Sequence, residues 1–452
     1  MLETADRLRS DALACFQAGV DAADPFAAVS RHLHFANATL KIADNCGTWQ
    51  RIHLIAFGKA ACPMLEAGLS IIPTERLASL PLAVTSDENF RVIQGAEVLA
   101  ASHPLPDQRG ILAAKKIIDR LSQTQAGDLV LLLISGGGSA LLPAPSQGIS
   151  LADKILTTEL LLASGANINA INCVRKHCSQ IKGGGLARLA AKADLEALVL
   201  SDVLGDDLSS IASGPAVADP SSFADAIAIL QNYQIWEQIP SSVRQHLAAG
   251  EAGLNPETLK PEDPLLQNKH HTVIGSNAMS VDAAVAEAGL LGYQTLQVPQ
   301  PVSGEAQKAA YQLAAQANQY LRQNPDQAIA LIAGGETTVS LGGEYGLGGR
   351  NQELALAFLL AAKQYDWSGN WCCLSAGSDG RDGPTDAAGG LVDQNTYQAM
   401  LAANYQPDQY LLAHNSYPLL QAVNALVISG ATGTNVADLQ IILLVPNNQK
   451  LP

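Results

Sequence analysis

Positive charge is scarce in this chain. Its 452 residues include 27 Lys and Arg against 42 Asp and Glu, which gives a formal net charge of −15. No run of Lys or Arg occurs, although binding a nucleic acid requires a basic face. The composition argues against a nucleic-acid partner. An anionic small molecule would have to be held by a few individual cations against an unfavourable overall field.

Signals for a membrane or for secretion are also lacking. No apolar stretch approaches the ~18 residues that a membrane span needs. The first residues, MLETADRLRSDA, are acidic and polar, unlike a signal peptide. The seven cysteines form no CxxC pair, and we expect reduced, mostly buried thiols. These observations predict a cytoplasmic protein with no membrane partner.

The common signatures of dinucleotide and metal sites are missing. No GxGxxG follows an early strand, which weakens a nicotinamide hypothesis. The Walker A pattern fails, because Ala60 follows Lys59 and His53 stands where the upstream glycine should be. HExxH and spaced Cys/His clusters are absent, so a structural zinc site is not expected.

What the chain does contain is apolar material for two cores, with 48% hydrophobic and 15% charged residues. Residues 1–46 are predicted to be helical, with a break at Pro25. Beyond them, short apolar runs such as 52–57 and 129–134 alternate with helical stretches. This alternation predicts an α/β fold with two domains, each a mainly parallel sheet flanked by helices.

A polar segment with three prolines, residues 250–264, is the expected linker between the domains. It divides the chain into an N-terminal domain at 1–250 and a C-terminal domain at 265–452.

Polar residues gather where the predicted strands end. In open α/β sheets, ligands bind outside the carboxyl ends of the strands, so these ends predict a binding cleft. Asn277 and Glu336 lie in two of them and are candidate substrate- or phosphate-binding residues. The ends are FGKAA, TSDEN, ASHPLPDQRG, ISGGGSALLPAP, SDVLGDD, IGSN, AGGETT, SAGSDGRDGPTD and ISGATGTN.

A glycine-rich loop follows the apolar run 129–134 directly. Its residues are Ser135, Gly136, Gly137, Gly138 and Ser139. Glycines let successive backbone N–H groups point inward as a nest for an anion, and the serines add hydroxyl donors. The alternative is a flexible turn between a strand and a helix.

Three cations stand beside glycines. Lys59 follows a strand, Lys182 precedes three glycines, and Arg350 follows Gly348 and Gly349 at the start of a helical run. A guanidinium and helix N-terminal amides can act on one anion. The alternative for each is a solvated or ion-paired surface residue, although we expect neither Lys59 nor Arg350 to lie in a core.

The basic residues upstream of Lys182 are ambiguous. Arg175 and Lys176 equally suit a helix end, where positive charge complements the helix dipole.

Two acidic groups suit Mg²⁺: Asp202, Asp206 and Asp207 in SDVLGDD, and Asp379, Asp382 and Asp386 in GSDGRDGPTD. The candidate ligands among them are Asp202, Asp206, Asp379 and Asp386. Mg²⁺ prefers oxygen ligands and keeps several waters while it bridges substrate phosphates. The alternative is aspartates in turns and at helix N-caps, where they are abundant.

Taken together, these motifs resemble the type 2 glycerate kinases (glycerate 2-kinases), whose C-terminal part is called the MOFRL domain. The resemblance runs from about residue 10 to residue 445 and its motifs are specific in length and order. The phrases that carry it are LISGGGSALLPAP, RKHCSQIKGGGLA, SDVLGDDLSSIASGP, GGETTVSLGG, GGRNQELAL, GSDGRDGPTDAAG and ATGTNVADL, with FGKAA and SHPLPDQRG in matching positions.

The resemblance implies ATP-dependent phosphorylation of D-glycerate at its 2-hydroxyl, giving 2-phospho-D-glycerate and ADP, with a requirement for Mg²⁺. It implies a Rossmann-like N-terminal domain and a MOFRL domain, with the active site in the cleft between them. By position in the motifs, Lys59 and Arg350 are the implied catalytic residues.

Two other functions compete with a kinase. An NAD(P)H-dependent hydroxypyruvate reductase should show a dinucleotide fingerprint, and none is found. A non-catalytic sugar-acid binding protein would need no Mg²⁺ ligands and no cations aimed at a transferring group. We therefore expect a kinase whose partners are glycerate and ATP, and the sequence leaves a homodimer open.

Overall fold

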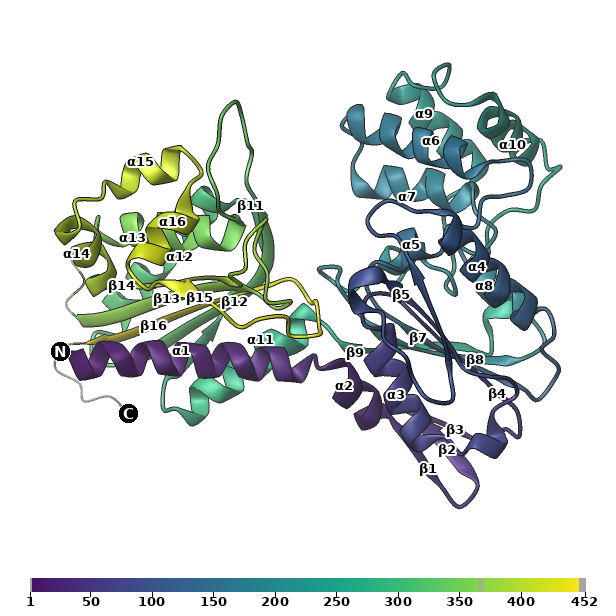
Figure 1. Cartoon of the computed structure of the whole chain (residues 1–452), viewed down its shortest axis with the longest axis horizontal. Helices are drawn as coiled ribbons and strands as arrows, with labels where there is room; N and C mark the ends of the chain where they lie inside the picture. Colours follow the sequence, from purple (N-terminus) through teal and green to yellow (C-terminus); the bar gives the residue numbers. More distant parts are fainter. Residues whose placement is uncertain (1, 366, 368, 447–452) are drawn as a thin grey trace. The chain divides into compact units, whose positions relative to one another are not determined.

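The computed structural model describes residues 2–365, 367 and 369–446. The chain forms two compact units: unit 1 contains residues 1–24 and 275–452, and unit 2 contains residues 25–274. Both are built from alternating helices and strands (Figure 1).

The helices of unit 2 and its short 3₁₀ turns are α2 (Pro25–His32), α3 (Ala61–Ile71), η1 (Thr74–Arg76), η2 (Asp87–Asn89), α4 (Gln108–Leu121), α5 (Gly138–Leu141), α6 (Leu151–Ala163), α7 (Ile168–His177), α8 (Gly185–Leu189), η3 (Ile211–Ser213), α9 (Phe223–Asn232), α10 (Ser241–Glu251) and η4 (Pro264–Leu266). Its strands are β1 (Leu33–Ala36), β2 (Thr39–Ile42), β3 (Asn45–Gly47), β4 (Ile52–Phe57), β5 (Leu82–Ser86), β6 (Glu97–Ala101), β7 (Leu129–Ile134), β8 (Asp194–Leu200) and β9 (Lys269–Gly275).

A six-stranded sheet in the order β6-β5-β4-β7-β8-β9 forms the centre of unit 2. Strands β4 to β8 pair in parallel, as predicted. Every residue of β4 and of β7 is buried, because helices cover both faces of these strands. The chain winds outward from β4 through β5 to β6, then returns to β7 on the other side of β4. The carboxyl ends of β4 and β7 therefore meet where the winding direction reverses.

Unit 1 holds the remaining helices, which are α1 (Leu2–Ala22), α11 (Asn277–Leu290), α12 (Ala306–Gln323), α13 (Arg350–Ala362), α14 (Gln394–Ala402), α15 (Pro407–Leu412) and α16 (Ser416–Ala422). Its strands are β10 (Gln294–Gln297), β11 (Val302–Glu305), β12 (Ile329–Thr338), β13 (Gly369–Gly377), β14 (Gly389–Asp393), β15 (Leu426–Val427) and β16 (Asp438–Pro446).

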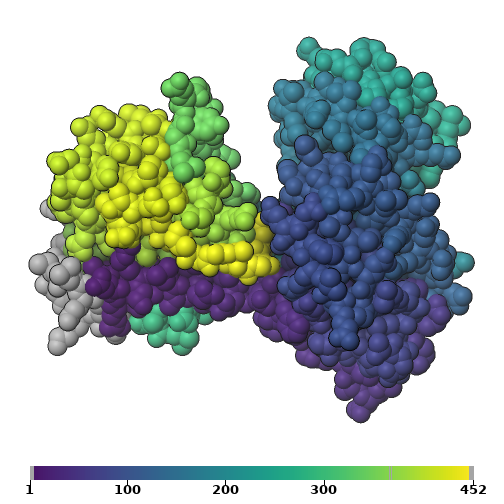
Figure 2. Space-filling view, viewed as in Figure 1, coloured from purple at the N-terminus to yellow at the C-terminus, as the bar shows by residue number. Residues whose placement is uncertain are grey.

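The sheet of unit 1 is a middle layer between two pairs of helices. Alternate residues of β16 point to opposite faces. Ile441 and Leu443 pack on the side of α1 and α11, whereas Ile442 and Leu444 pack on the side of α12 and α13. In Figure 2 the purple residues of α1 lie along the yellow and green residues of this unit. The α/β fold with flanking helices is thus confirmed for both units.

The strand directions of unit 1 differ from the mainly parallel sheet that the sequence predicts. Strands β10 and β11 are parallel to β12, but β16 runs antiparallel to both β12 and β13, and β13 to β14. The loop between β13 and β14 contains no helix, so the chain turns back instead of crossing over. Alternation of helices and strands alone could not reveal that reversal.

The N-terminal region also differs from the prediction. The break at Pro25 is confirmed, since α2 begins there, but residues 33–47 form the small sheet β1-β2-β3 and not a helix. Asn37 and Ala38 both have positive φ, at 51° and 61°, which suits a two-residue hairpin turn. The cross-strand pairing outweighs the helical propensity of the surrounding residues.

The division between the units lies elsewhere than expected. Helix α1 belongs to unit 1 although it starts the chain, and the expected linker at 250–264 is packed in unit 2. Leu259 is fully buried in the core of unit 2, and its N–H donates to Gly183 O. Prolines and polar residues here mark a packed irregular segment, because its backbone finds partners in unit 2.

Candidate active site

Two loops of unit 2 meet at the point where the winding of its sheet reverses, one after β4 and one after β7. The N–H of Lys59 donates to Gly136 O at 2.8 Å, and the N–H of Ala60 donates to Ser135 Oγ at 3.0 Å. Gly58 adopts a φ of +120°, and a Cβ there would lie 2.2 Å from Ser135 Oγ. Only glycine lets the loops approach so closely. The Ser135 hydroxyl therefore joins the two loops.

Lys59 shares its surroundings with a carboxylate and a histidine. A Cβ on Gly137 would lie 3.2 Å from Lys59 Cγ and 3.1 Å from His103 Cδ2. A Cβ on Gly136 would lie 2.1 Å from Asp202 Oδ2. Among the described residues, the Lys59 ammonium has no hydrogen bond and no carboxylate within 4.0 Å. Lys59 is therefore a cation with unused donors at the topological switch point, the place between the ends of β4 and β7 where the winding of the sheet reverses.

Charge and burial set the protonation of these neighbours. Burial raises the pKa of Asp202 above its usual value of 3.8, while Lys59 opposes that shift. Burial and then the charge of Lys59 lower the pKa of His103 below 6.5, which keeps its ring neutral at pH 7. The motif SHPLPDQRG supplies His103, which the sequence analysis does not select as a site residue. Its position beside a lysine appears only in three dimensions.

Ser139 and Lys182 meet at the far end of the glycine-rich loop. The Lys182 ammonium donates to Ser139 Oγ at 2.7 Å and to Ser139 O at 3.1 Å. Gly138 begins the short helix α5 in this loop. Burial, followed by the charges of Arg175 and Lys154, lowers the pKa of Lys182 well below its usual value. The structure therefore brings Lys59, the loop, Lys182 and Asp202 together in one unit.

Asp206 does not share in these contacts. Its backbone has a φ of +55° and its N–H donates to Val203 O at 3.1 Å, as part of the loop after β8. Across the described residues, no group of three or more His, Cys, Asp or Glu side chains could hold a metal ion.

Arg350 of unit 1 is held by two carboxylates. Its Nε donates to Asp438 Oδ2 at 2.7 Å and its Nη2 to Asp438 Oδ1 at 2.9 Å, a bidentate pair. Its Nη1 lies 3.3 Å from Glu336 Oε1. Asp438 is fully buried, whereas the Arg350 side chain is 35% exposed. Despite burial, these carboxylates raise the pKa of Arg350 above its usual value, so it stays charged.

A second buried carboxylate positions the helix that begins with Arg350. Asp382 accepts the N–H groups of Asn351 at 3.1 Å and Gln352 at 2.9 Å, and so caps α13. Burial raises the pKa of Asp382 to about 6. All residues of α13 after Arg350 are buried. The helix is therefore a rigid support that presents Arg350 at its N-terminus, where an anion is favoured.

The other predicted residues of unit 1 have structural partners. Asn277 is buried and donates to Val436 O at 2.8 Å and Asp438 O at 3.0 Å, so it fixes the segment that carries Asp438. Asp379 accepts the N–H of Arg381 at 3.0 Å in a turn. Asp386 is exposed and accepts from Tyr417 Oη at 2.7 Å.

Of the two carboxylates that organise Arg350, the sequence pattern did not indicate Asp438, and it indicated Asp382 only as a member of an acidic cluster. Asp438 lies in the quoted phrase ATGTNVADL, and its single acidic residue was a usable signal. Asp382 was visible only as one aspartate among three in a turn.

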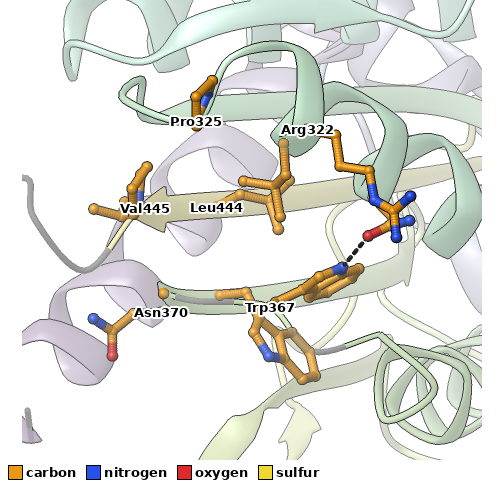
Figure 3. Close-up of a pocket in the computed structure, with 11 residues that line it drawn as sticks. Arg322, Pro325, Trp367, Asn370, Leu444 and Val445 are labelled. Carbon is orange, nitrogen blue, oxygen red and sulfur yellow. Dashed lines mark hydrogen bonds between the residues drawn. The ribbon is translucent and has the colours of Figure 1, made fainter.

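A separate pocket of about 300 Å³ lies at the other end of the sheet in unit 1 (Figure 3). Leu444 and Val445 line it, near the end of β16, whereas Asp438 begins that strand. At about 3.3 Å per residue, the two ends are about 20 Å apart. Trp367 Nε1 donates to Asn318 Oδ1 at 3.1 Å beside it. This pocket contains none of the predicted site residues.

Comparison with known proteins shows the family of this chain. Residues 11–248 match the family model of a domain described as of unknown function, DUF4147, and residues 329–438 match the MOFRL family. A "Glycerate 2-kinase" from Pyrococcus horikoshii is 40% identical over 94% of this chain and 94% of its own. This chain belongs to the glycerate 2-kinase family.

Other members of the family carry two kinds of name. A "D-glycerate 2-kinase" from Thermotoga maritima is 38% identical over 87% of this chain and 91% of its own. A protein from Agrobacterium vitis, 40% identical over 87% of each chain, carries the name "Putative hydroxypyruvate reductase". The crystal structure of a glycerate kinase from Thermotoga maritima superposes with a TM-score of 0.85 at 35% identity, covering 97% of this chain and 100% of that one. The family fold is therefore the fold of both units described above.

Proposed function

We propose that this protein phosphorylates D-glycerate at its 2-hydroxyl with ATP, giving 2-phospho-D-glycerate and ADP. Family membership and the names of the glycerate 2-kinase relatives support the reaction. The observation that carries it is the cation of Lys59 beside the glycine-rich loop, at the switch point of an open sheet. An anionic ligand there meets backbone donors and a positive charge together.

Phosphoryl transfer leaves little covalent work to a protein, so positioning and electrostatic stabilisation do most of it. Negative charge spreads over the oxygens of the transferred group. Lys59 and Arg350 are the proposed cations for that charge. The backbone of Lys59 is held by its hydrogen bond to Gly136, and the guanidinium of Arg350 is held by Asp438.

Asp202 is the proposed ligand of the Mg²⁺ ion that accompanies the nucleotide. Mg²⁺ commonly binds one or two protein carboxylates and takes its other ligands from water and phosphates, so a single half-buried carboxylate beside an anion loop fits it. Bound there, the ion would neutralise phosphate charge. Asp206, Asp379 and Asp386 keep a proposed part only through water, because each lies in a loop with other partners or in solvent.

Coupled assays on the purified protein test the reaction. ATP should be consumed only when D-glycerate and Mg²⁺ are both present, and enolase should convert the product without added phosphoglycerate mutase. Asp202→Asn should shift the Mg²⁺ dependence, whereas Asp119→Asn, at an exposed position of α4, should leave it unchanged. A requirement for the mutase would place the phosphate on the other hydroxyl.

Hydroxypyruvate reduction is the second candidate, because relatives carry that name. NADH oxidation with hydroxypyruvate at a rate equal to or above the kinase rate would overturn the kinase proposal.

A further inference from the structure

Arg175 carries a half-buried positive charge with no carboxylate to neutralise it. It lies in the last turn of α7, and its Nη2 donates to Ser139 Oγ in the glycine-rich loop. In the described part of the chain, this is the one hydrogen bond of its guanidinium, and no carboxylate lies within 4.0 Å. Burial lowers its pKa, and no acidic neighbour offsets that effect. Desolvating a charge without a partner is costly, so a partner is expected from outside the protein.

Neighbouring side chains increase the imbalance. Two buried lysines, Lys154 and Lys182, lie close enough to feel the charge of Arg175, and burial, with a further contribution from that charge, lowers the pKa of each. Lys154 donates to Cys178 O at 3.3 Å, and Lys182 donates to Ser139 and to Ala212 O at 3.5 Å. Their hydrogen-bond acceptors are therefore carbonyl and hydroxyl oxygens, which carry no full charge.

The hydroxyl of Ser139 holds the guanidinium in place but cannot itself bind a ligand. It accepts from Arg175 and Lys182, so its own proton goes to Ser213 Oγ at 2.8 Å. Ser213 in turn donates to Asn172 Oδ1 at 3.3 Å. Both lone pairs and the proton of Ser139 are thus used. Arg175 Nη2 uses only one of its two N–H groups on Ser139, so its other N–H and the N–H of the adjacent nitrogen on that edge of the guanidinium remain as a fixed pair of unused donors.

We propose that Arg175 binds the carboxylate of the hydroxy acid and so makes the enzyme specific for glycerate. This assignment rests on the proposed function. A planar guanidinium matches a carboxylate with two parallel hydrogen bonds. Ser139 orients Arg175, and Gly137 lies beside Lys59. These two loop residues are two positions apart, so their Cα atoms are at most about 7 Å apart. In glycerate the carboxylate and the 2-hydroxyl are on adjacent carbons, which suits so short a span.

Arg175 does lie in the last turn of α7, where its charge complements the helix dipole, and the proposal adds a ligand to that position. Arg175 is a specificity residue, whereas Ser139 and Lys182 are positioning residues that act through it. The competing ligand of the same chemistry is a phosphate of the nucleotide, and the experiment separates the two.

The test compares Arg175→Gln and Arg175→Lys with Arg244→Gln, an arginine of unit 2 on α10 that pairs with Glu237 at the surface. Calorimetry measures the Kd of D-glycerate, of glyceramide, which lacks the carboxylate, and of ATP. Steady-state assays measure the corresponding KM values.

Arg175→Gln should weaken D-glycerate at least ~30-fold, the size expected for losing one buried charged partner. Glyceramide and ATP should change less than about threefold. Arg175→Lys should lie between, which also shows that the site is still folded, and Arg244→Gln should match the wild type.

A loss of ATP affinity with unchanged glycerate affinity would reassign Arg175 to the nucleotide and overturn the proposal, as would no change in either. If the wild type binds or phosphorylates no glycerate, the proposed function fails and this assignment with it. Normal wild-type turnover with an unaltered Arg175→Gln variant removes this assignment alone.

Discussion

At the scale of single residues, the fork of Arg350 on Asp438 decides what substitution there should do. Arg350→Ala is expected to lower kcat at least ~10²-fold, the size of losing one preorganised charge donor. Arg350→Lys should recover little, because an ammonium cannot make both hydrogen bonds to Asp438. Steady-state kinetics on each variant measures this, and a near-normal kcat for Arg350→Ala would remove the catalytic assignment.

The same fork changes the stability expectation. The sequence placed Arg350 outside any core, but Arg350→Ala leaves the fully buried Asp438 without its main partner. We expect a loss of about 1–3 kcal/mol, discounted for the partial exposure of the arginine. The double variant Arg350→Ala with Asp438→Asn should regain part of it in a thermal melt. A melt unchanged by Arg350→Ala would contradict the ion pair.

The closeness of Lys59 to His103 can be tested by measuring the pKa of that histidine. Burial and then Lys59 lower the pKa of His103, so Lys59→Met should raise that pKa toward 6.5 while burial still holds it below. NMR titration of the histidine side chains measures the change without reference to activity. Lys41→Met, on the small sheet of unit 2, is the matched control and should leave His103 unaffected. If the pKa of His103 is the same in Lys59→Met as in the wild type, Lys59 and His103 do not interact.

At the scale of elements, α13 depends on a cap that comes from a distant loop. Asp382→Asn should cost about 1 kcal/mol of stability, the usual size of a lost N-cap, and should also lower kcat because Arg350 opens the same helix. Ser150→Ala removes the capping box of α6 and is the matched control. It should cost similar stability and leave kcat unchanged. Equal kcat values for both variants would separate the cap from catalysis.

The buried Asp382 also predicts a pH dependence with a definite sign. Its folded pKa of about 6 lies above the unfolded value of 3.8, so the folded state binds the proton more tightly between these values. The contribution of Asp382 to the free energy of unfolding should therefore fall as pH rises from about 4 to about 6 and level off above. Denaturant melts across that range should show a smaller fall for Asp382→Asn. If the stability of the wild type falls no more steeply with pH than that of Asp382→Asn, the raised pKa of Asp382 is contradicted.

At the scale of the whole molecule, the two units predict which fragment folds. Residues 25–274 should melt cooperatively, because they contain all six strands of their sheet and their own cores. The fragment 1–250, cut at the linker expected from the sequence, carries α1 without the sheet it packs on. It also lacks Leu259 and β9. Circular dichroism and calorimetric melts should show a broad, lower transition for 1–250, and equal transitions would contradict the division.

None of the helices in the described part of the chain is both long enough and apolar enough to span a bilayer.

The sequence by itself determined the α/β class, the family and the motifs at the strand ends, because these depend on local pattern. The buried run of β7 and the break at Pro25 followed from periodicity and from proline chemistry. Candidate site residues could be proposed from the sequence because glycines, cations and aspartates gather after predicted strands.

Tertiary structure alone decided which of those residues meet. Asp202 reaches the glycine-rich loop while Asp206, four residues on, does not. Asp438 and Arg350, 88 residues apart, form a bidentate pair, and α1 joins the far end of the chain. Pairing between strands and burial against distant helices set these contacts, and both depend on residues far apart in the sequence. A local pattern can show that a side chain suits a site, but only packing fixes its partner.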